Sequence, residues 1–128
     1  MKTRYTVALS MLAGAAIGAF AIQGLHAQAK PRAFVVSEVD VTNQEGFTKE
    51  YVPLAVKALT DSGNKPLARG GKTASIEGAP PKRVAVINSF DSLDQAVAAY
   101  NSPAYKEARK TGNKYATFRI YAVEELAK

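Results

Sequence analysis

The segment of residues 83–109, RVAVINSFDSLDQAVAAYNSPAYKEAR, constrains the fold of this chain more than any other part of the sequence. Residues 83–90 are largely apolar, as expected of a central strand. Ser92, with a glutamine three residues later, forms a capping box that predicts the start of a helix. Ser102 and Pro103 predict a second helix, with serine at the cap and proline at the first helical position. The segment therefore predicts a strand and two helices of a mixed α and β domain.

Upstream, residues 33–41 alternate in the manner of a strand. Val35 and Val39 belong to one face of that strand, and Val36 and Glu38 belong to the other. The pattern predicts a sheet with two distinct faces.

A helix is predicted after Thr42 and Asn43, which offer a cap. Apolar residues then recur at intervals of three and four and form one helical stripe. The stripe consists of Phe47, Tyr51, Leu54, Ala55, Ala58 and Leu59. Pro53 lies inside it, so we expect a kink or a restarted helix there. Gly63 suits a left-handed cap at the helix end.

Gly70 and Gly71 predict a tight hairpin turn between two short strands at residues 66–69 and 73–77. A last strand is predicted at residues 116–123. The order is β-α-β-β-β-α-β, which is a decorated βαββαβ unit. The sequence thus predicts an α+β fold.

The first 29 residues predict a secretory signal peptide. They have a basic start, an apolar run at residues 7–22 and the small-x-small sequence Ala27-Gln28-Ala29. The run is shorter than the roughly 18–20 residues that span a bilayer. We expect cleavage after Ala29 and a periplasmic or secreted domain at residues 30–128. An uncleaved signal, the alternative, would be the only membrane contact.

Cysteine is absent, and the single histidine, His26, lies inside the predicted signal. Thiol or imidazole catalysis and metal ligation by these groups are therefore excluded for residues 30–128, and no metal or cofactor is predicted. This part of the chain carries 15 basic and 11 acidic residues with the signs interspersed. Such a moderate charge does not form the basic stripe of a nucleic-acid binder, so no nucleic-acid partner is expected.

Several short motifs occur together between about residue 34 and residue 123. They are Leu67-x-Arg69-Gly70-Gly71, Glu77-Gly78, Arg83, Phe90-x-Ser92-Leu93 with Ala96, and Tyr100-Asn101-Ser102-Pro103-x-Tyr105 with Arg109. In this combination the chain resembles the family catalogued as domain of unknown function 1330. The resemblance implies a ferredoxin-like domain with an antiparallel sheet, paired as a homodimer into a dimeric α/β barrel. A partner would also cover the sheet face that the helices leave bare.

The motifs supply the candidate ligand-binding residues. They are Arg69, Glu77, Arg83, Tyr100, Ser102 and Tyr105. Arg69 could clamp an anion with its planar fork, or it could pair with Glu77 across the predicted hairpin. Ser102 is also explained by its role as a helix cap.

Glu38 and Tyr100 are the candidate catalytic residues. Glu38 could act as a general base if its strand face looks into a barrel, or it could pair with a lysine at an edge. Tyr100 and Tyr105 could offer hydroxyls to a ligand, or pack through their rings.

Two function classes remain open from the sequence. One is a small-molecule-binding module for an anionic or aromatic ligand. The other is a cofactor-independent enzyme, similar to the monooxygenases and isomerases of the same superfamily, acting on a small organic substrate. Fold-level analogy supports the enzyme class, and function does not follow from fold.

Overall fold

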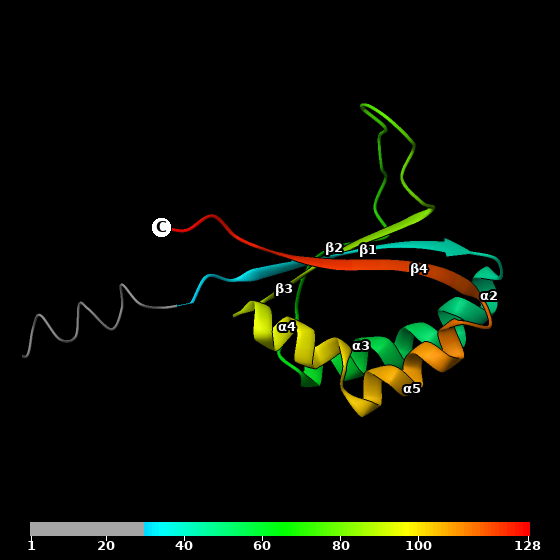
Figure 1. The fold of residues 1–128 in the computed structure, drawn as a ribbon. Helices are drawn as coiled ribbons and strands as arrows, with labels where there is room; N and C mark the ends of the chain where they lie inside the picture. The colour runs from blue at the N-terminus through cyan, green and yellow to red at the C-terminus, as the bar shows by residue number, and fades with distance from the viewer. Residues whose placement is uncertain (1–29) are drawn as a thin grey trace, which may run out of the picture. The chain divides into compact units, whose positions relative to one another are not determined.

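Four strands form one antiparallel sheet in the computed structural model, which describes residues 30–128 (Figure 1). The strands are β1 (Ala33–Val41), β2 (Lys65–Arg69), β3 (Val84–Phe90) and β4 (Ala116–Glu124). Their order across the sheet is β2-β3-β1-β4, so the first strand is central. This arrangement confirms the predicted α+β, ferredoxin-like domain. The predicted signal peptide lies outside the described residues.

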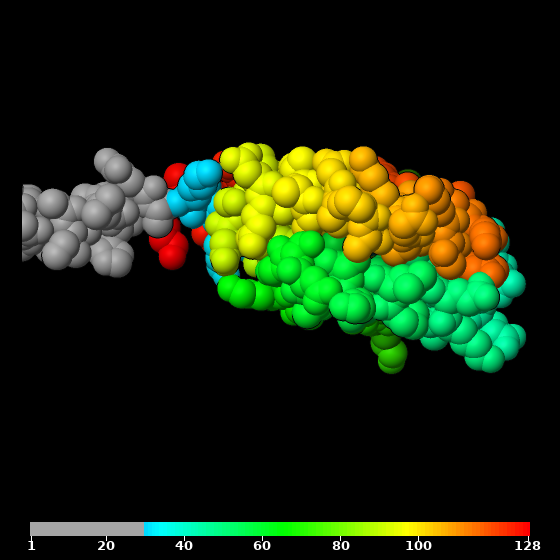
Figure 2. All heavy atoms as spheres, turned by 90° about the horizontal axis from the view of Figure 1, so that it is seen from below, coloured from blue at the N-terminus to red at the C-terminus, as the bar shows by residue number. Residues whose placement is uncertain are grey.

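The helical layer consists of short helices that cover one face of the sheet. The elements are α2 (Gln44–Gly46), η1 (Phe47–Tyr51), α3 (Val52–Asp61), α4 (Leu93–Tyr100) and α5 (Pro103–Gly112). Figure 2 shows α3 in green beside α4 and α5 in yellow and orange. None of the helices within residues 30–128 is long and apolar enough to cross a bilayer.

The helix predicted around Pro53 is interrupted, as expected. The π-helical segment η1 directly precedes α3, and Pro53 occupies the first turn of α3. A proline is tolerated there because a backbone N–H in the first helical turn has no partner within the helix. Phe47 and Tyr51 of η1 and Ala55 of α3 are all buried in the core.

Local capping sets the starts of α4 and α5, as predicted. The Ser92 hydroxyl accepts a hydrogen bond from the backbone N–H of Gln95 at 3.1 Å. The Ser102 hydroxyl accepts one from the backbone N–H of Tyr105 at 3.3 Å and donates to the Ala99 carbonyl at 2.8 Å. Each serine satisfies a donor that the first turn of a helix leaves free.

The alternation of β1 separates a covered face from a bare one. Val35 and Val39 are buried beneath the helices. The opposite side of the sheet, which we call the outer face, exposes apolar side chains within the described chain: Ile87, Tyr121 and Val123 are 38%, 48% and 51% exposed. The helical layer therefore leaves the outer face uncovered.

The predicted hairpin between residues 66–69 and 73–77 is wrong. β2 pairs with β3, so that Arg69 lies opposite Val86, and residues 73–77 form no strand. Residues 70–83 are instead a long exposed loop, which we call the arm. The arm extends from the side of the sheet that faces away from the helices (Figure 1). Glu77 belongs to the arm and does not face Arg69 across a hairpin.

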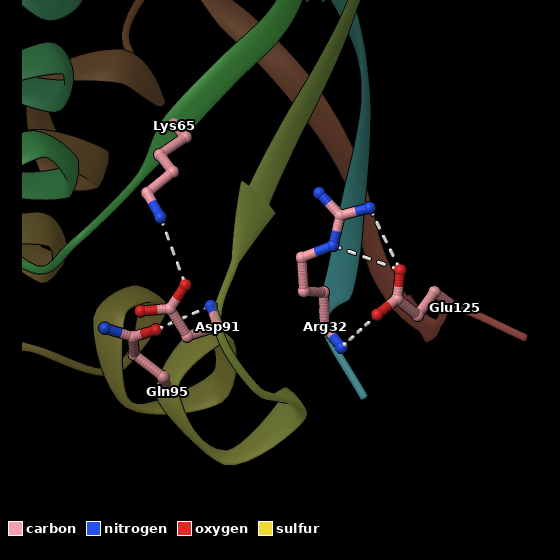
Figure 3. Close-up of polar contacts among 5 residues, drawn as sticks. All are labelled: Arg32, Lys65, Asp91, Gln95 and Glu125. Atoms are coloured by element: carbon pink, nitrogen blue, oxygen red, sulfur yellow. Dashed lines mark hydrogen bonds and ion pairs between the residues drawn. The ribbon is translucent and has the colours of Figure 1, made fainter. Parts of the chain in front are cut away.

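Two ties hold the sheet ends in place (Figure 3). The Arg32 backbone N–H and side-chain Nε each donate to the Glu125 carboxylate at 3.0 Å, which joins the start of β1 to the end of β4. The Lys65 ammonium lies 3.2 Å from the Asp91 carboxylate and joins β2 to the turn after β3. Gln95 accepts from the Asp91 backbone N–H at 2.8 Å and fixes that turn.

Candidate functional site

A pocket of about 80 Å³ lies between the covered face of the sheet and α3. Most of its wall is apolar. Arg69, Asn88 and Tyr100 contribute polar groups from β2, β3 and α4, and Ser37 contributes one from β1. The lining residues are Ser37, Val39, Phe47, Tyr51, Val52, Ala55, Val56, Leu59, Arg69, Val84, Val86, Asn88, Tyr100, Tyr105, Phe118 and Ile120. An apolar cavity with a few grouped polar atoms is typical of small-molecule sites.

Strand register brings the polar residues of the pocket together. Arg69 of β2 pairs with Val86 of β3, and Val86 pairs with Ser37 of β1. Because directly paired residues share a face, Arg69 and Ser37 both point to the helix side. Asn88 lies two residues along β3 and is 2% exposed. We call Ser37, Arg69, Asn88 and Tyr100 the polar end of the pocket.

Tyr100 reaches this group from the end of α4. The side-chain amide of Asn88 donates to the Tyr100 hydroxyl oxygen at 2.9 Å. Burial raises the pKa of Tyr100, and hydrogen bonds from Asn88 and Ser37 and the positive charge of Arg69 oppose that rise. The Tyr100 hydroxyl is therefore protonated at neutral pH, so it can donate a hydrogen bond.

Tyr51 and Tyr105 form a second polar contact in the pocket wall. Their hydroxyl oxygens are 3.3 Å apart and buried. Burial is the largest cause that raises the pKa of each tyrosine, and the neighbouring Arg109 opposes the rise in both. Both hydroxyls remain neutral at physiological pH.

Arg109 of α5 lies behind this wall. Its guanidinium carbon is 3.5 Å from the centroid of the Phe118 ring, in a cation–π contact. Its Nη1 atom is buried and has no hydrogen-bond partner within residues 30–128. Arg109 therefore turns inward, whereas Lys106 and Lys110 of the same helix are exposed.

The structure brings three of the six predicted ligand-binding residues to the pocket: Arg69, Tyr100 and Tyr105. Ser102 is occupied as the cap of α5. Glu77 and Arg83 are exposed in the arm and do not line the pocket.

Glu38 lies on the outer face, away from the pocket. Its carboxylate is 3.2 Å from the Arg119 guanidinium of β4, its direct cross-strand partner. The backbone N–H of Lys82 also approaches it at 3.4 Å. Glu38 therefore pairs with an arginine, where the sequence suggested a lysine. Tyr100, the other catalytic candidate, lies on the opposite side of the sheet.

Three residues of the pocket, Ser37, Tyr51 and Asn88, are not among the candidate site residues named from the sequence. Ser37 and Asn88 are polar residues at positions where their strands otherwise point apolar side chains inward, and this was the available signal. Tyr51 belongs to the predicted apolar stripe, and only the packing of η1 on α5 shows that its hydroxyl meets Tyr105.

Within residues 30–128, His, Cys, Asp and Glu side chains form no group of three or more that could hold a metal ion. The polar end of the pocket holds one cation and neutral donors. Its chemistry suits the binding of an organic group more than the ligation of a cation.

Comparison with known proteins relates the chain to one family. Residues 32–126 match the sequence profile described as "Domain of unknown function (DUF1330)". A search of curated proteins gave no match.

Solved structures share the fold at low sequence identity. RPA0582, a protein of unknown function from Rhodopseudomonas palustris, has a TM-score of 0.62 at 15% identity, covering 76% of this chain and 84% of its own. SnoaB, a cofactor-independent oxygenase from Streptomyces nogalater, has a TM-score of 0.55 at 10% identity, covering 77% and 96%. An EthD-like protein from Ralstonia eutropha has a TM-score of 0.51 at 14% identity, covering 74% and 92%. These matches establish a common fold.

Proposed function

The chain belongs to the family described as domain of unknown function DUF1330, and we propose that it is an exported homodimer that binds a small organic molecule in the pocket between its sheet and α3. The pocket carries this proposal. Its wall is mostly aliphatic and aromatic, and Arg69, the one charged side chain among its lining residues, lies at the polar end. A ligand with an apolar body and one polar group matches this division.

Native mass spectrometry tests ligand binding. The protein is purified from its own host and sprayed without denaturant, and an extra mass released on unfolding identifies the ligand. We expect a small organic molecule. A chain that carries no extra mass, and that gains none after incubation with a small-molecule extract of the host, would contradict the proposal.

Two tryptophan variants locate the binding site. Val56→Trp places an indole in the pocket wall, whereas Val97 of α4 is 50% exposed and does not line the pocket. We expect Val56→Trp to lose the retained ligand and Val97→Trp to keep it, because a filled pocket leaves no room. Retention by both variants would place the ligand elsewhere.

An enzymatic role is the second candidate, supported by the structural similarity to the cofactor-independent oxygenase SnoaB. Without a redox cofactor, such an enzyme must take electrons for dioxygen from the substrate itself, so the substrate would be an electron-rich aromatic molecule. Oxygen uptake with a panel of polyphenols tests this role. Uptake that requires the protein and is lost in Val56→Trp would favour catalysis over binding alone.

The bare outer face supports the homodimer. Ile87, Tyr121 and Val123 expose an apolar surface on a sheet that only one helical layer covers. A second copy placed against this surface would bury it on both protomers.

Light scattering at micromolar concentration tests the assembly. We expect twice the monomer mass for the wild-type protein and the monomer mass for Tyr121→Glu. Leu54→Glu is the control, because Leu54 is 49% exposed on α3, away from the outer face. A monomeric wild-type protein, or equal dissociation of both variants, would contradict pairing through the sheet.

Export is supported by the basic start, apolar run and small-x-small sequence of residues 1–29. The intact mass of the protein from a periplasmic fraction tests it. A chain that begins at Lys30 is expected, and a full-length chain in the cytoplasm would contradict export.

A further inference from the structure

Two buried asparagines connect the end of α3 to the polar end of the pocket. Asn64, between α3 and β2, is 8% exposed, and Asn88 of β3 is 2% exposed. The Asn64 amide nitrogen donates to the Asn88 carbonyl oxygen at 3.2 Å, and the Asn88 amide nitrogen donates to the Tyr100 oxygen at 2.9 Å. The three side chains form a hydrogen-bond relay with one direction.

The direction of the relay decides what Tyr100 can do. An asparagine side chain has one accepting oxygen and one donating nitrogen. Because the Asn88 oxygen is occupied by Asn64, the Asn88 nitrogen faces Tyr100, and the Tyr100 oxygen accepts. The Tyr100 proton is then free to point into the pocket.

Arg69 adds further hydrogen-bond donors to the polar end of the pocket. A guanidinium has five N–H donors and no acceptor. Within residues 30–128, Arg69 has no carboxylate partner, since the ion pairs of this region involve other side chains. Arg69 and Tyr100 both line the pocket. A ligand group placed between them must accept hydrogen bonds, and a negative charge on it would be balanced by the single cation.

We propose that this end of the pocket binds the carboxylate of a small organic monoacid through Arg69 and the Tyr100 hydroxyl. Asn64 and Asn88 are positioning residues that direct the Tyr100 proton toward the ligand. A doubly charged group would leave one charge unmatched in a site with one cation, which favours a carboxylate over a phosphate ester. This inference rests on the proposed ligand binding and adds the chemical class of the ligand.

Benzoate and benzyl alcohol are suitable probes, because they share an aromatic ring and differ in charge. Their dissociation constants are measured by NMR titration of the purified protein. We expect benzoate to bind about tenfold more tightly, as one charge-assisted hydrogen-bond pair provides. Equal affinities, or failure of benzoate to bind, would overturn the inference. Ligand retention in native mass spectrometry would still stand in that case, so the two proposals fail separately.

Arg69→Gln should make the two affinities about equal, because it should weaken the binding of benzoate more than that of benzyl alcohol. Lys65→Gln is the matched control, because Lys65 lies on the same strand but pairs with Asp91 outside the pocket. It should retain the preference for benzoate. An equal loss in both variants would mean that only the net charge of the protein matters, and would overturn the inference.

Asn64 tests the relay, because it lies outside the pocket wall. Asn64→Leu should reduce the preference for benzoate severalfold without changing the affinity for benzyl alcohol, whereas a purely structural role would weaken both. The wild-type protein gives a second readout that needs no variant. Nuclear Overhauser contacts should join the Asn88 amide protons to the Tyr100 ring, and contacts from those protons to Asn64 instead would show a reversed relay.

Discussion

Tyr51 of η1 and Tyr105 of α5 meet with their hydroxyl oxygens 3.3 Å apart in the interior of the domain. The Tyr105 ring also lies 4.7 Å from the Tyr100 ring in a T-shaped contact, measured between centroids. The chain of rings therefore runs from the helix interface to the polar end of the pocket. The same side chains therefore pack η1 against α5 and shape the wall of the pocket.

Alkaline pH should destabilise the fold through these tyrosines. Burial raises the pKa of Tyr51, Tyr100 and Tyr105 above the usual tyrosine value of 10.0. Below pH 10 these tyrosines are neutral in both the folded and the unfolded chain, so their stabilising contribution is fully present. As the pH rises above 10, the tyrosines of the unfolded chain ionise first, and this contribution is lost. Each can contribute a loss of about 1.4 kcal/mol per pH unit. Urea unfolding between pH 9 and pH 11, about the usual phenol pKa, measures the slope, and Tyr51→Phe should reduce it. Ionisation of all tyrosines near their usual pKa in the native absorbance spectrum would contradict this account.

Gly112→Ala should destabilise the domain by about 1–3 kcal/mol. A Cβ atom at this position would lie 2.7 Å from Cδ2 of Tyr51 and 3.0 Å from Cζ of Phe118, so packed rings would have to move. Gly71→Ala in the arm is the control, because its Cβ would have no neighbour within 4 Å. Urea unfolding compares the variants, and an unchanged midpoint for Gly112→Ala would show that the interface can adjust.

Ser102→Ala should lower the free energy of unfolding by about 1 kcal/mol, since it removes the cap of α5. Ligand retention should not change, because the Ser102 hydroxyl is used by the Tyr105 and Ala99 backbone. Chemical denaturation and native mass spectrometry measure the two properties on one sample. If Ser102→Ala lost the ligand with unchanged stability, Ser102 would be a ligand-binding residue and this prediction would be wrong.

Glu125→Gln should reduce stability at neutral pH but not in strong acid. The backbone N–H and the side chain of Arg32 lower the pKa of the Glu125 carboxyl. A lowered pKa in the folded state contributes stability above the unfolded value, and this contribution disappears as pH falls through the folded value. Melting temperatures at pH 7 and below pH 3, under the usual glutamate pKa, test the prediction. Glu45→Gln is the control, because Glu45 forms an exposed pair with Lys49 within one helical segment, and such pairs contribute little. Equal losses at both pH values would contradict it.

Local signals predicted the parts of the fold that depend on neighbouring residues. Ser92 and Ser102 cap helices, and Pro53 starts one, because each effect acts within a single turn. The strand at residues 73–77 was predicted wrongly because alternation shows that a segment can form a strand but does not supply a partner. β2 takes β3 as that partner, and the two glycines after Arg69 begin the arm instead of a hairpin.

The candidate site was predictable to a similar degree. Arg69, Tyr100 and Tyr105 were selected from motifs, and the pocket unites them. The relay from Asn64 through Asn88 to Tyr100 joins three separate elements, so no spacing within the sequence reveals it. The alternation of side chains in residues 33–41 assigned Glu38 and Ser37 to opposite faces of the strand. It did not show which of the two faces the helices cover.

The tie between Arg32 and Glu125 has a mechanical consequence. The Glu125 backbone N–H also donates to the Arg32 carbonyl at 2.9 Å, so the chain enters and leaves the domain at the same end of the β1–β4 pair. Pulling these two points apart would load the antiparallel hydrogen bonds one pair at a time, because the bonds lie perpendicular to the strands. The domain should peel open from this end under a small force, with β1 and β4 separating from each other.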